Sequence, residues 1–172
     1  MKQICTILFI LIFSGLQANS NPDSKDLYVP SFTVASDTLP AVFMIGQFTD
    51  PFEKLNATNQ TLLQVCQNDV YLAYDKWLHM LGDLESVSES VGLSLKGSKF
   101  WFSVFWNGDG TIKHFAFFPK NGSKSIDQKV LIEVLQTFIN NYKMPVSADA
   151  AFYNYGSAAF PLPDRSPVAR KS

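Results

Sequence analysis

Residues 100–106 read Phe-Trp-Phe-Ser-Val-Phe-Trp and run directly into Asn-Gly-Asp-Gly at 107–110. Aromatic and β-branched residues are typical of strands. Aromatics on both faces predict a strand that is covered on both sides or lies centrally in its sheet. Asn-Gly and Asp-Gly accept the positive φ angles that tight hairpins need. The stretch therefore predicts a strand over 99–106, a hairpin turn, and a return strand over 111–118 that closes at Pro119.

Helices are expected on both sides of this hairpin. Asn68 or Asp69 caps the first one. Its predicted buried face, with spacings of three and four residues, consists of Val70, Tyr74, Trp77, Leu81 and Leu84. A helix that starts at Ser125 or Asp127 follows the hairpin. Its predicted inward residues are Ile126, Val130, Leu131, Val134, Leu135 and Phe138.

The order of these elements decides the fold class. A last strand is expected over 152–160, and an interrupted helical segment that opens at Asp50-Pro51 precedes the capped helix. We predict an α+β fold, in which a small antiparallel or mixed sheet has its helices packed on one face.

The chain ends differ in character from this central part. Residues 1–20 combine Lys2, an apolar run over 4–13 and a small-residue site at 18–20, which is the pattern of a cleaved signal peptide. An uncleaved signal anchor is the alternative. Residues 21–40 are expected to form an extended arm, 41–163 a single domain, and 164–172 a disordered basic tail. The protein is thus expected to be exported, periplasmic or extracellular, with no stable membrane span after signal cleavage.

Composition narrows the possible functions. The chain has 172 residues, 47% of them hydrophobic, with 14 basic against 15 acidic groups. Such a near-neutral balance argues against nucleic acid as a partner, since polyanion binding depends on an excess of positive charge. The apolar fraction excludes a wholly disordered chain.

We find no residue pattern that predicts catalysis, a metal or a cofactor. Asp75, His79 and Asp83 share one helical face and could ligate a metal, but that face is expected to point to solvent, and no fourth ligand is suggested. We expect a protein that is not an enzyme. An unrecognised hydrolase is the remote alternative.

Aromatic residues offer a second kind of site. Core packing is the first interpretation of the aromatic strand. An apolar groove for a small ligand is another, and its candidate residues are Tyr74, Trp77, Trp101 and Trp106. This interpretation predicts a periplasmic or secreted carrier of a small apolar ligand.

Residues 96–163 resemble the TonB C-terminal domain. The resemblance rests on Phe100–Trp106, Asp109-Gly110-Thr111-Ile112-Lys113, a following helix, Tyr142-Lys143-Met144-Pro145, and a terminal strand that ends at Phe160-Pro161. Two features depart from a TonB energy transducer. This sequence shows no membrane anchor with a long proline-rich spacer, and the helical segment over 51–91 has no counterpart in the short domain.

The resemblance implies a periplasmic, non-catalytic module that pairs an extended peptide onto its sheet edge. The last strand would be that edge, with Phe152, Tyr153 and Tyr155 as its candidate binding residues. Our prediction is therefore an exported protein- or peptide-binding module of the bacterial cell envelope. Proline at Tyr153 or Tyr155 is expected to weaken binding, because the edge would lose a backbone donor.

Overall fold

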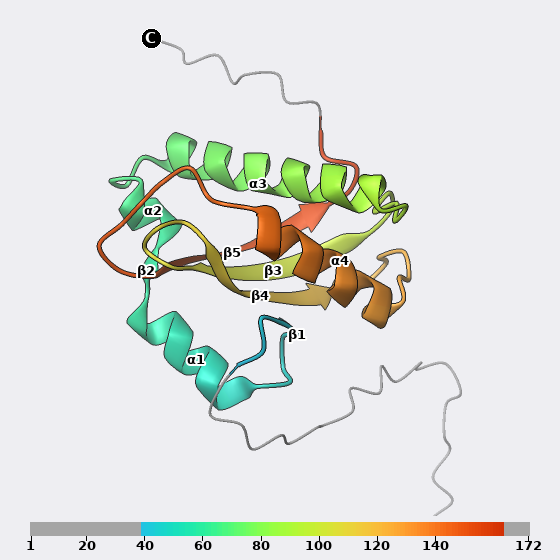
Figure 1. The fold of residues 1–172 in the computed structure, drawn as a ribbon, viewed down its shortest axis with the longest axis horizontal. Coiled ribbons are helices and arrows are strands. Elements are labelled where there is room, and N and C mark those ends of the chain that lie inside the picture. The colour runs from blue at the N-terminus through green and yellow to red at the C-terminus, as the bar shows by residue number, and fades with distance from the viewer. Residues whose placement is uncertain (1–38, 164–172) are drawn as a thin grey trace, which may run out of the picture. The chain divides into compact units, whose positions relative to one another are not determined.

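The computed structural model describes residues 39–163 (Figure 1). The predicted signal peptide at 1–20, nearly all of the arm over 21–40 and the basic tail at 164–172 lie outside these residues. None of the helices in 39–163 has the length and apolar character that crossing a membrane requires.

A five-stranded mixed sheet forms the centre of the fold, which confirms the α+β class. Its strand order is β1-β4-β3-β5-β2. The aromatic strand β3 (Lys99–Trp106) is central, with β4 (Ile112–Pro119) and β5 (Phe152–Ala159) antiparallel on its two sides. The short strands β1 (Val42–Met44) and β2 (Gln60–Thr61) extend the sheet in parallel with β4 and β5.

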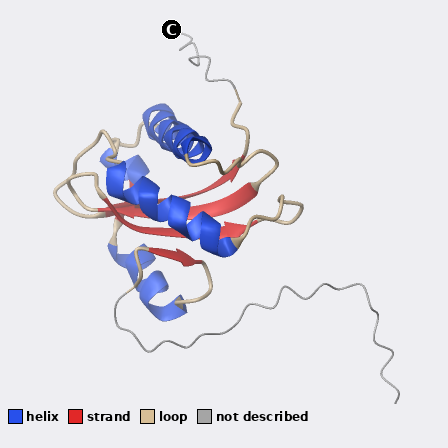
Figure 2. Cartoon of the chain, turned by 45° about the vertical axis from the view of Figure 1, so that its right-hand side comes forward, coloured by secondary structure: helices blue, strands red, loops and turns tan. Residues whose placement is uncertain are grey.

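The main core lies on one face of this sheet, which we call the first face. Side chains alternate along a strand, and the even-numbered residues of β3 point to this side. Phe100, Phe102, Val104 and Trp106 all belong to the main core cluster. Two helices, α3 (Val70–Ser90) and α4 (Gln128–Asn141), pack further members of the cluster against the sheet. Both lie on the same side of the strands in Figure 2.

Helix α3 departs from its predicted buried face at its N-terminal end. Asp69 caps it by accepting a hydrogen bond from the Leu72 amide at 3.0 Å, and Trp77, Leu81 and Leu84 are buried as expected. Val70 and Tyr74 are instead 63% and 56% exposed. Val70 has the same helical phase as Ser88, which is fully buried. The predicted face is therefore right from Trp77 onward. In the first turns, Leu72 and Ala73 pack against the core in place of Val70 and Tyr74.

Helix α4 also departs from its predicted buried face. Asp127 caps it, with its carboxylate accepting hydrogen bonds from the amides of Lys129 at 2.9 Å and Val130 at 3.1 Å. Val130 itself is 42% exposed and Ile126 is half-buried. Four of the six predicted inward residues are buried, namely Leu131, Val134, Leu135 and Phe138.

The opposite face of the sheet, the second face, is covered at one end. Helix α1 (Thr49–Thr58) places Phe52 edge-on to Phe105, with ring centroids 5.9 Å apart. The prediction that the helices pack on one face is therefore wrong for α1. Phe105 is an odd-numbered residue of β3, so its ring points away from the first face and needs separate cover. The short helix α2 (Leu62–Val65) follows β2 and contacts β5.

Candidate functional site

The outer side of β5 presents backbone groups that point away from the sheet. In an antiparallel pair, hydrogen-bonded residues alternate with residues whose amides and carbonyls point outward. The Phe160 amide donates to the Ser98 carbonyl at 2.9 Å. Because the alternation continues along the strand, the backbone groups of Tyr155, Ser157 and Ala159 point away from β3.

This part of β5 has no neighbouring strand within residues 39–163. Strand β2 pairs only with Phe152 and Tyr153. Tyr155, Ser157 and Ala159 are exposed. The strand is eight residues long, and its pairing with β3 runs from Phe152 to Ala159 without a register shift. The segment 154–159 is therefore a straight edge with an open side, which we call the β5 edge.

Protective features are missing from the β5 edge. Proteins usually block an exposed edge with a charged side chain, a proline or a bulge, since an unpaired strand recruits other strands. Residues 154–159 read Asn-Tyr-Gly-Ser-Ala-Ala. Nothing in this segment prevents an extended chain from pairing with it.

The structure separates the three residues of the predicted peptide-binding edge. Phe152 is buried on the first face, where its ring stacks on Trp106 at 5.2 Å between centroids. Phe152 and Tyr153 lie opposite the two residues of β2, so β5 is not the outer strand at these positions. Tyr155 alone lies on the β5 edge. Ser157 and Ala159, which the sequence did not single out, complete it.

The short strand β2 explains why the sequence did not predict that one end of β5 is paired and the other open. The sequence predicts an interruption of the helical segment near 56–59 and no strand after it, since a two-residue strand leaves no periodic signal. The alternation of β5 residues around Tyr155 could have found Ser157 and Ala159. It needed only the assumption that β3 is the inner neighbour.

A row of contacting side chains, two aromatic rings and a lysine, crosses the second face beside the β5 edge. The rings of Trp101 and Tyr155 are stacked, with centroids 5.3 Å apart and an interplanar angle of 8°. The Lys120 ammonium lies 4.2 Å from the centre of the Trp101 ring, a cation–π contact. Tyr155 is 54% exposed. The row Lys120, Trp101, Tyr155 therefore ends at the open edge of the sheet.

The four residues of the predicted apolar groove do not meet in one cavity. Trp77 and Trp106 are buried in the core of the first face, and Tyr74 is exposed at the start of α3. Trp101 points to the second face, because it alternates with Phe100 and Phe102 along β3. A single ligand could not contact all four.

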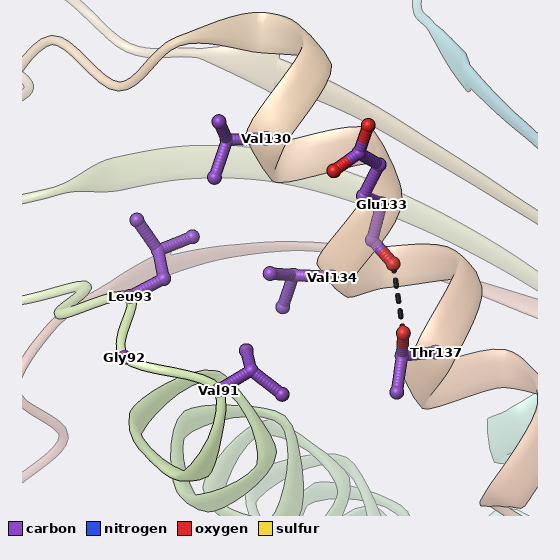
Figure 3. A pocket seen from close by; sticks show the side chains of 7 residues that line it. All are labelled: Val91, Gly92, Leu93, Val130, Glu133, Val134 and Thr137. Atoms are coloured by element: carbon purple, nitrogen blue, oxygen red, sulfur yellow. Dashed lines mark hydrogen bonds between the residues drawn. The ribbon is translucent and has the colours of Figure 1, made fainter.

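A shallow open depression of about 290 Å³ lies elsewhere, between the end of α3 and α4 (Figure 3). Its lining is mainly apolar and consists of Val91, Gly92, Leu93, Val130, Glu133, Val134 and Thr137. The Thr137 hydroxyl donates to the Glu133 carbonyl at 3.0 Å, so this polar group is already satisfied within the helix. None of the predicted groove residues lines the depression.

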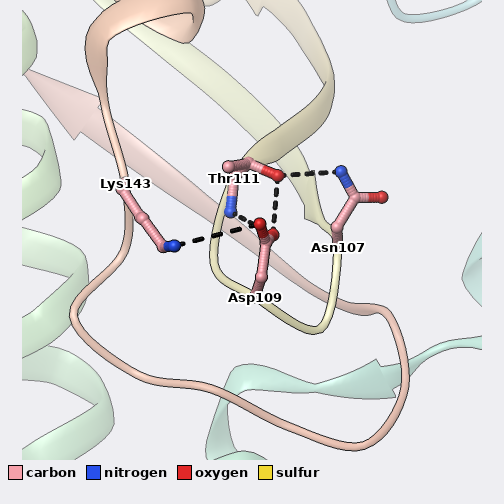
Figure 4. A network of polar contacts seen from close by, with 4 residues as sticks. All are labelled: Asn107, Asp109, Thr111 and Lys143. Carbon is pink, nitrogen blue, oxygen red and sulfur yellow. Dashed lines mark hydrogen bonds and ion pairs between the residues drawn. The ribbon is translucent and has the colours of Figure 1, made fainter.

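The hairpin between β3 and β4 holds a polar network (Figure 4). The Asp109 carboxylate accepts hydrogen bonds from the Thr111 hydroxyl at 2.7 Å and amide at 3.0 Å. These bonds lower the pKa of Asp109. Asn107 donates to the Thr111 hydroxyl at 2.9 Å, and Lys143 lies 3.9 Å from Asp109. The network serves the turn itself and ties it to the segment after α4.

The remaining titratable candidates are the acidic and histidine residues of α3 and the buried cysteine. Asp75 and His79 are 3.4 Å apart and more than half exposed, and Asp83 is exposed as predicted. Residues 39–163 contain no group of three or more His, Cys, Asp or Glu side chains placed to hold a metal ion. Cys66 is buried, and its burial raises the pKa of the thiol.

Comparison with known proteins gives one distant similarity. No protein-family model matches the chain, and no solved structure matches it. The chain is 23% identical over 160 residues to the human protein mono-ADP-ribosyltransferase PARP14, and the match covers 91% of this chain. It spans only 8% of the human protein.

Proposed function

We propose that this chain is an exported, non-catalytic module of the bacterial cell envelope that binds an extended peptide as an added strand at the β5 edge. The observation that carries the proposal is the open segment 154–159, whose outward backbone groups belong to Tyr155, Ser157 and Ala159. Main-chain hydrogen bonds to such an edge supply affinity without requiring a deep pocket.

Two sequence features support the proposal. The order of β3, β4, α4 and β5 is the order that the resemblance to the TonB C-terminal domain implies for residues 96–163. The signal-peptide pattern of residues 1–20 supports export. The name of the human relative describes mono-ADP-ribosyl transfer by a far longer protein, and the proposal takes no support from it.

Strand β2 defines the length of the proposed site. It occupies the edge at Phe152 and Tyr153, and α2 begins directly after it. The α2 start is held by a capping box, in which the Thr61 amide donates to the Gln64 side chain at 2.7 Å. An added strand therefore has about five or six residues of β5 to pair with, starting beyond Tyr153.

A selection of random extended peptides against the purified full-length chain tests the proposal. Hydrogen exchange on the selected complex should slow at the amides of Tyr155, Ser157 and Ala159. The amides of Asn154 and Gly156 should change little, because they already face β3. Protection that falls on another surface would contradict the proposal.

A matched pair of variants separates the backbone from the side chain. Ser157→Pro removes an outward amide and fills the edge with the proline ring, which an edge strand tolerates without unfolding. Ser157→Ala changes only the hydroxyl. We expect Ser157→Pro to abolish binding of the selected peptides and Ser157→Ala to preserve it. Equal binding by both variants would reject strand addition at this edge.

A further inference from the structure

We propose that the peptide bound at the β5 edge carries an aromatic residue beside Tyr155 and an acidic residue four positions away, beside Ala159. This inference rests on the proposed function and names the chemistry of its partner. It follows from the stacked rings and the positive charges on the second face.

The aromatic requirement follows from how this sheet pairs its strands. Rings on β3 and β5 stack wherever both strands carry one on the second face. Phe105 and Tyr153 have centroids 5.6 Å apart, and Trp101 and Tyr155 have centroids 5.3 Å apart. Tyr153 lies directly opposite Phe105, whereas Tyr155 lies opposite Ser103 and reaches Trp101 diagonally. Directly opposed side chains on adjacent strands begin about 5 Å apart, and diagonal neighbours about 7–8 Å apart are still within reach of aromatic rings.

Tyr155 is the outermost ring of its row. Trp101 lies on its inner side, and Lys120 lies beyond Trp101. The side chain opposite Tyr155 on an added strand would begin about 5 Å from it, on the side of the ring away from β3. Because Tyr155 is 54% exposed, an aromatic side chain there would remove the largest apolar surface from water.

The acidic requirement follows from two lysines at the same end of this face. Lys99 lies opposite Ala159 across the β3–β5 pair. Its carbonyl accepts the Lys120 amide at 2.8 Å, so the two lysines are also neighbours. Neither lysine has a carboxylate partner among residues 39–163. A carboxylate beside Ala159 would lie two strands from Lys99, a distance that the two long side chains can span, and Lys120 would add positive charge from the far side of Lys99.

The spacing of the two features follows from the strand itself. Tyr155 and Ala159 are four residues apart and point to the same face. Their opposite positions on an added strand are also four apart. The peptide residue midway between these two positions lies beside Ser157, which is small and exposed. This peptide position therefore accepts a side chain of any moderate size.

The test uses two synthetic peptides and the full-length chain. One has the sequence Thr-Phe-Thr-Val-Thr-Glu-Thr, and the other is its reverse, so both strand directions are sampled. Binding is measured by fluorescence anisotropy with a labelled N-terminus. We expect one direction to bind. Replacing its Phe by Ala should weaken binding about threefold to tenfold, as for other aromatic pairs.

Protein variants assign this effect to Tyr155 and Lys99. In Tyr155→Ala, the change from Phe to Ala in the peptide should have no further effect. In Lys99→Glu, a peptide with Lys in place of Glu should bind better than the original. Both residues are exposed, and Tyr155→Phe and Lys99→Arg serve as conservative controls that should retain binding.

The outcomes distinguish this inference from the proposed function. Suppose that Ser157→Pro abolishes binding, but that replacing the Phe or the Glu of the peptide has no effect. This result would overturn the inference and leave strand addition intact. Failure of both peptides to bind would also overturn the inference, and the random selection would still decide the proposed function. Binding unaffected by Ser157→Pro would contradict both.

Discussion

The indole of Trp77 lies directly against the backbone of Gly156. A Cβ on Gly156 would be 3.0 Å from the Trp77 Nε1 and 3.1 Å from two of its ring carbons. This contact joins α3 to β5 at the middle of the strand that forms the proposed edge. A Cβ at this position would force the indole or the strand to shift by a few tenths of an ångström, and the core holds both in place.

We therefore expect Gly156→Ala to destabilise the fold by about 1–3 kcal/mol, the usual cost of overpacking a core. Urea unfolding measures the change. Ser157→Ala is the control, because Ser157 is exposed and its variant should stay within about 0.5 kcal/mol of the parent. An unchanged urea midpoint for Gly156→Ala would show that the indole can move at no cost.

The hairpin turn gives a second prediction. Gly110 has a φ of +87°, and a Cβ there would overlap the Met144 carbonyl oxygen and lie 2.9 Å from that of Val146. We expect Gly110→Ala to cost about 2–4 kcal/mol, because it combines backbone strain with displacement of the neighbouring loop.

Gly122 is the matched control for Gly110. Its φ is +72°, and a Cβ there would meet nothing within 4 Å. Gly122→Ala should therefore cost only the strain, about 1 kcal/mol. Urea midpoints for the two variants separate strain from crowding. Equal losses would mean that the 144–146 segment does not confine the turn.

His114 predicts a pH dependence of stability. The residue is 9% exposed, and its Nδ1 lies 2.9 Å from the Pro40 carbonyl, to which the neutral ring donates. Burial lowers the pKa of His114 below its ordinary value of 6.5, against an opposing hydrogen bond to Pro40. The unfolded chain then binds the proton more readily than the folded one. Stability should fall as pH drops through 6.5 toward the folded-state pKa.

Urea unfolding at pH 7.5 and pH 5.0 measures this dependence. His114→Gln removes the titration and should reduce the difference between the two pH values. His79→Gln is the control, since His79 lies in an exposed pair with Asp75 that contributes little to stability. A parent chain that is more stable at pH 5.0 would contradict the sign of the prediction.

Cys66 predicts slow thiol chemistry in the native state. It is 3% exposed, and burial is the main cause of its raised pKa. In a Cys5→Ser background, iodoacetamide should label Cys66 slowly in buffer and rapidly in urea, because reaction requires an exposed thiolate. Labelling at similar rates in both conditions would show that the segment around α2 opens easily.

Local patterns in the sequence predicted most of the secondary structure. The run of aromatic residues predicted β3, and the Asn-Gly-Asp-Gly run predicted the hairpin. The capping candidates Asn68 or Asp69, and Ser125 or Asp127, include the residues that cap α3 and α4. Each of these signals lies within a few residues of the element it specifies. Periodicity identified part of the buried face of each helix, namely Trp77, Leu81 and Leu84 of α3 and Leu131, Val134, Leu135 and Phe138 of α4.

What periodicity could not determine was where along a helix burial begins. Val70 and Val130 have the right phase or nearly so, yet both are exposed. The part of β5 that another strand covers was equally unpredictable. Strand β2 is two residues long, and its pairing with β5 brings together segments about ninety residues apart.

The sequence by itself therefore determined the α+β class, the central aromatic strand and the strand that forms the proposed edge. These depend on side-chain patterns that are written locally. Only the tertiary structure decided that β2 occupies one end of β5, that the predicted groove residues are divided between core and surface, and that Trp101 and Tyr155 stack beside the open end. The physical reason is that strand pairing and stacking depend on which distant segments become neighbours, and no local pattern encodes that choice.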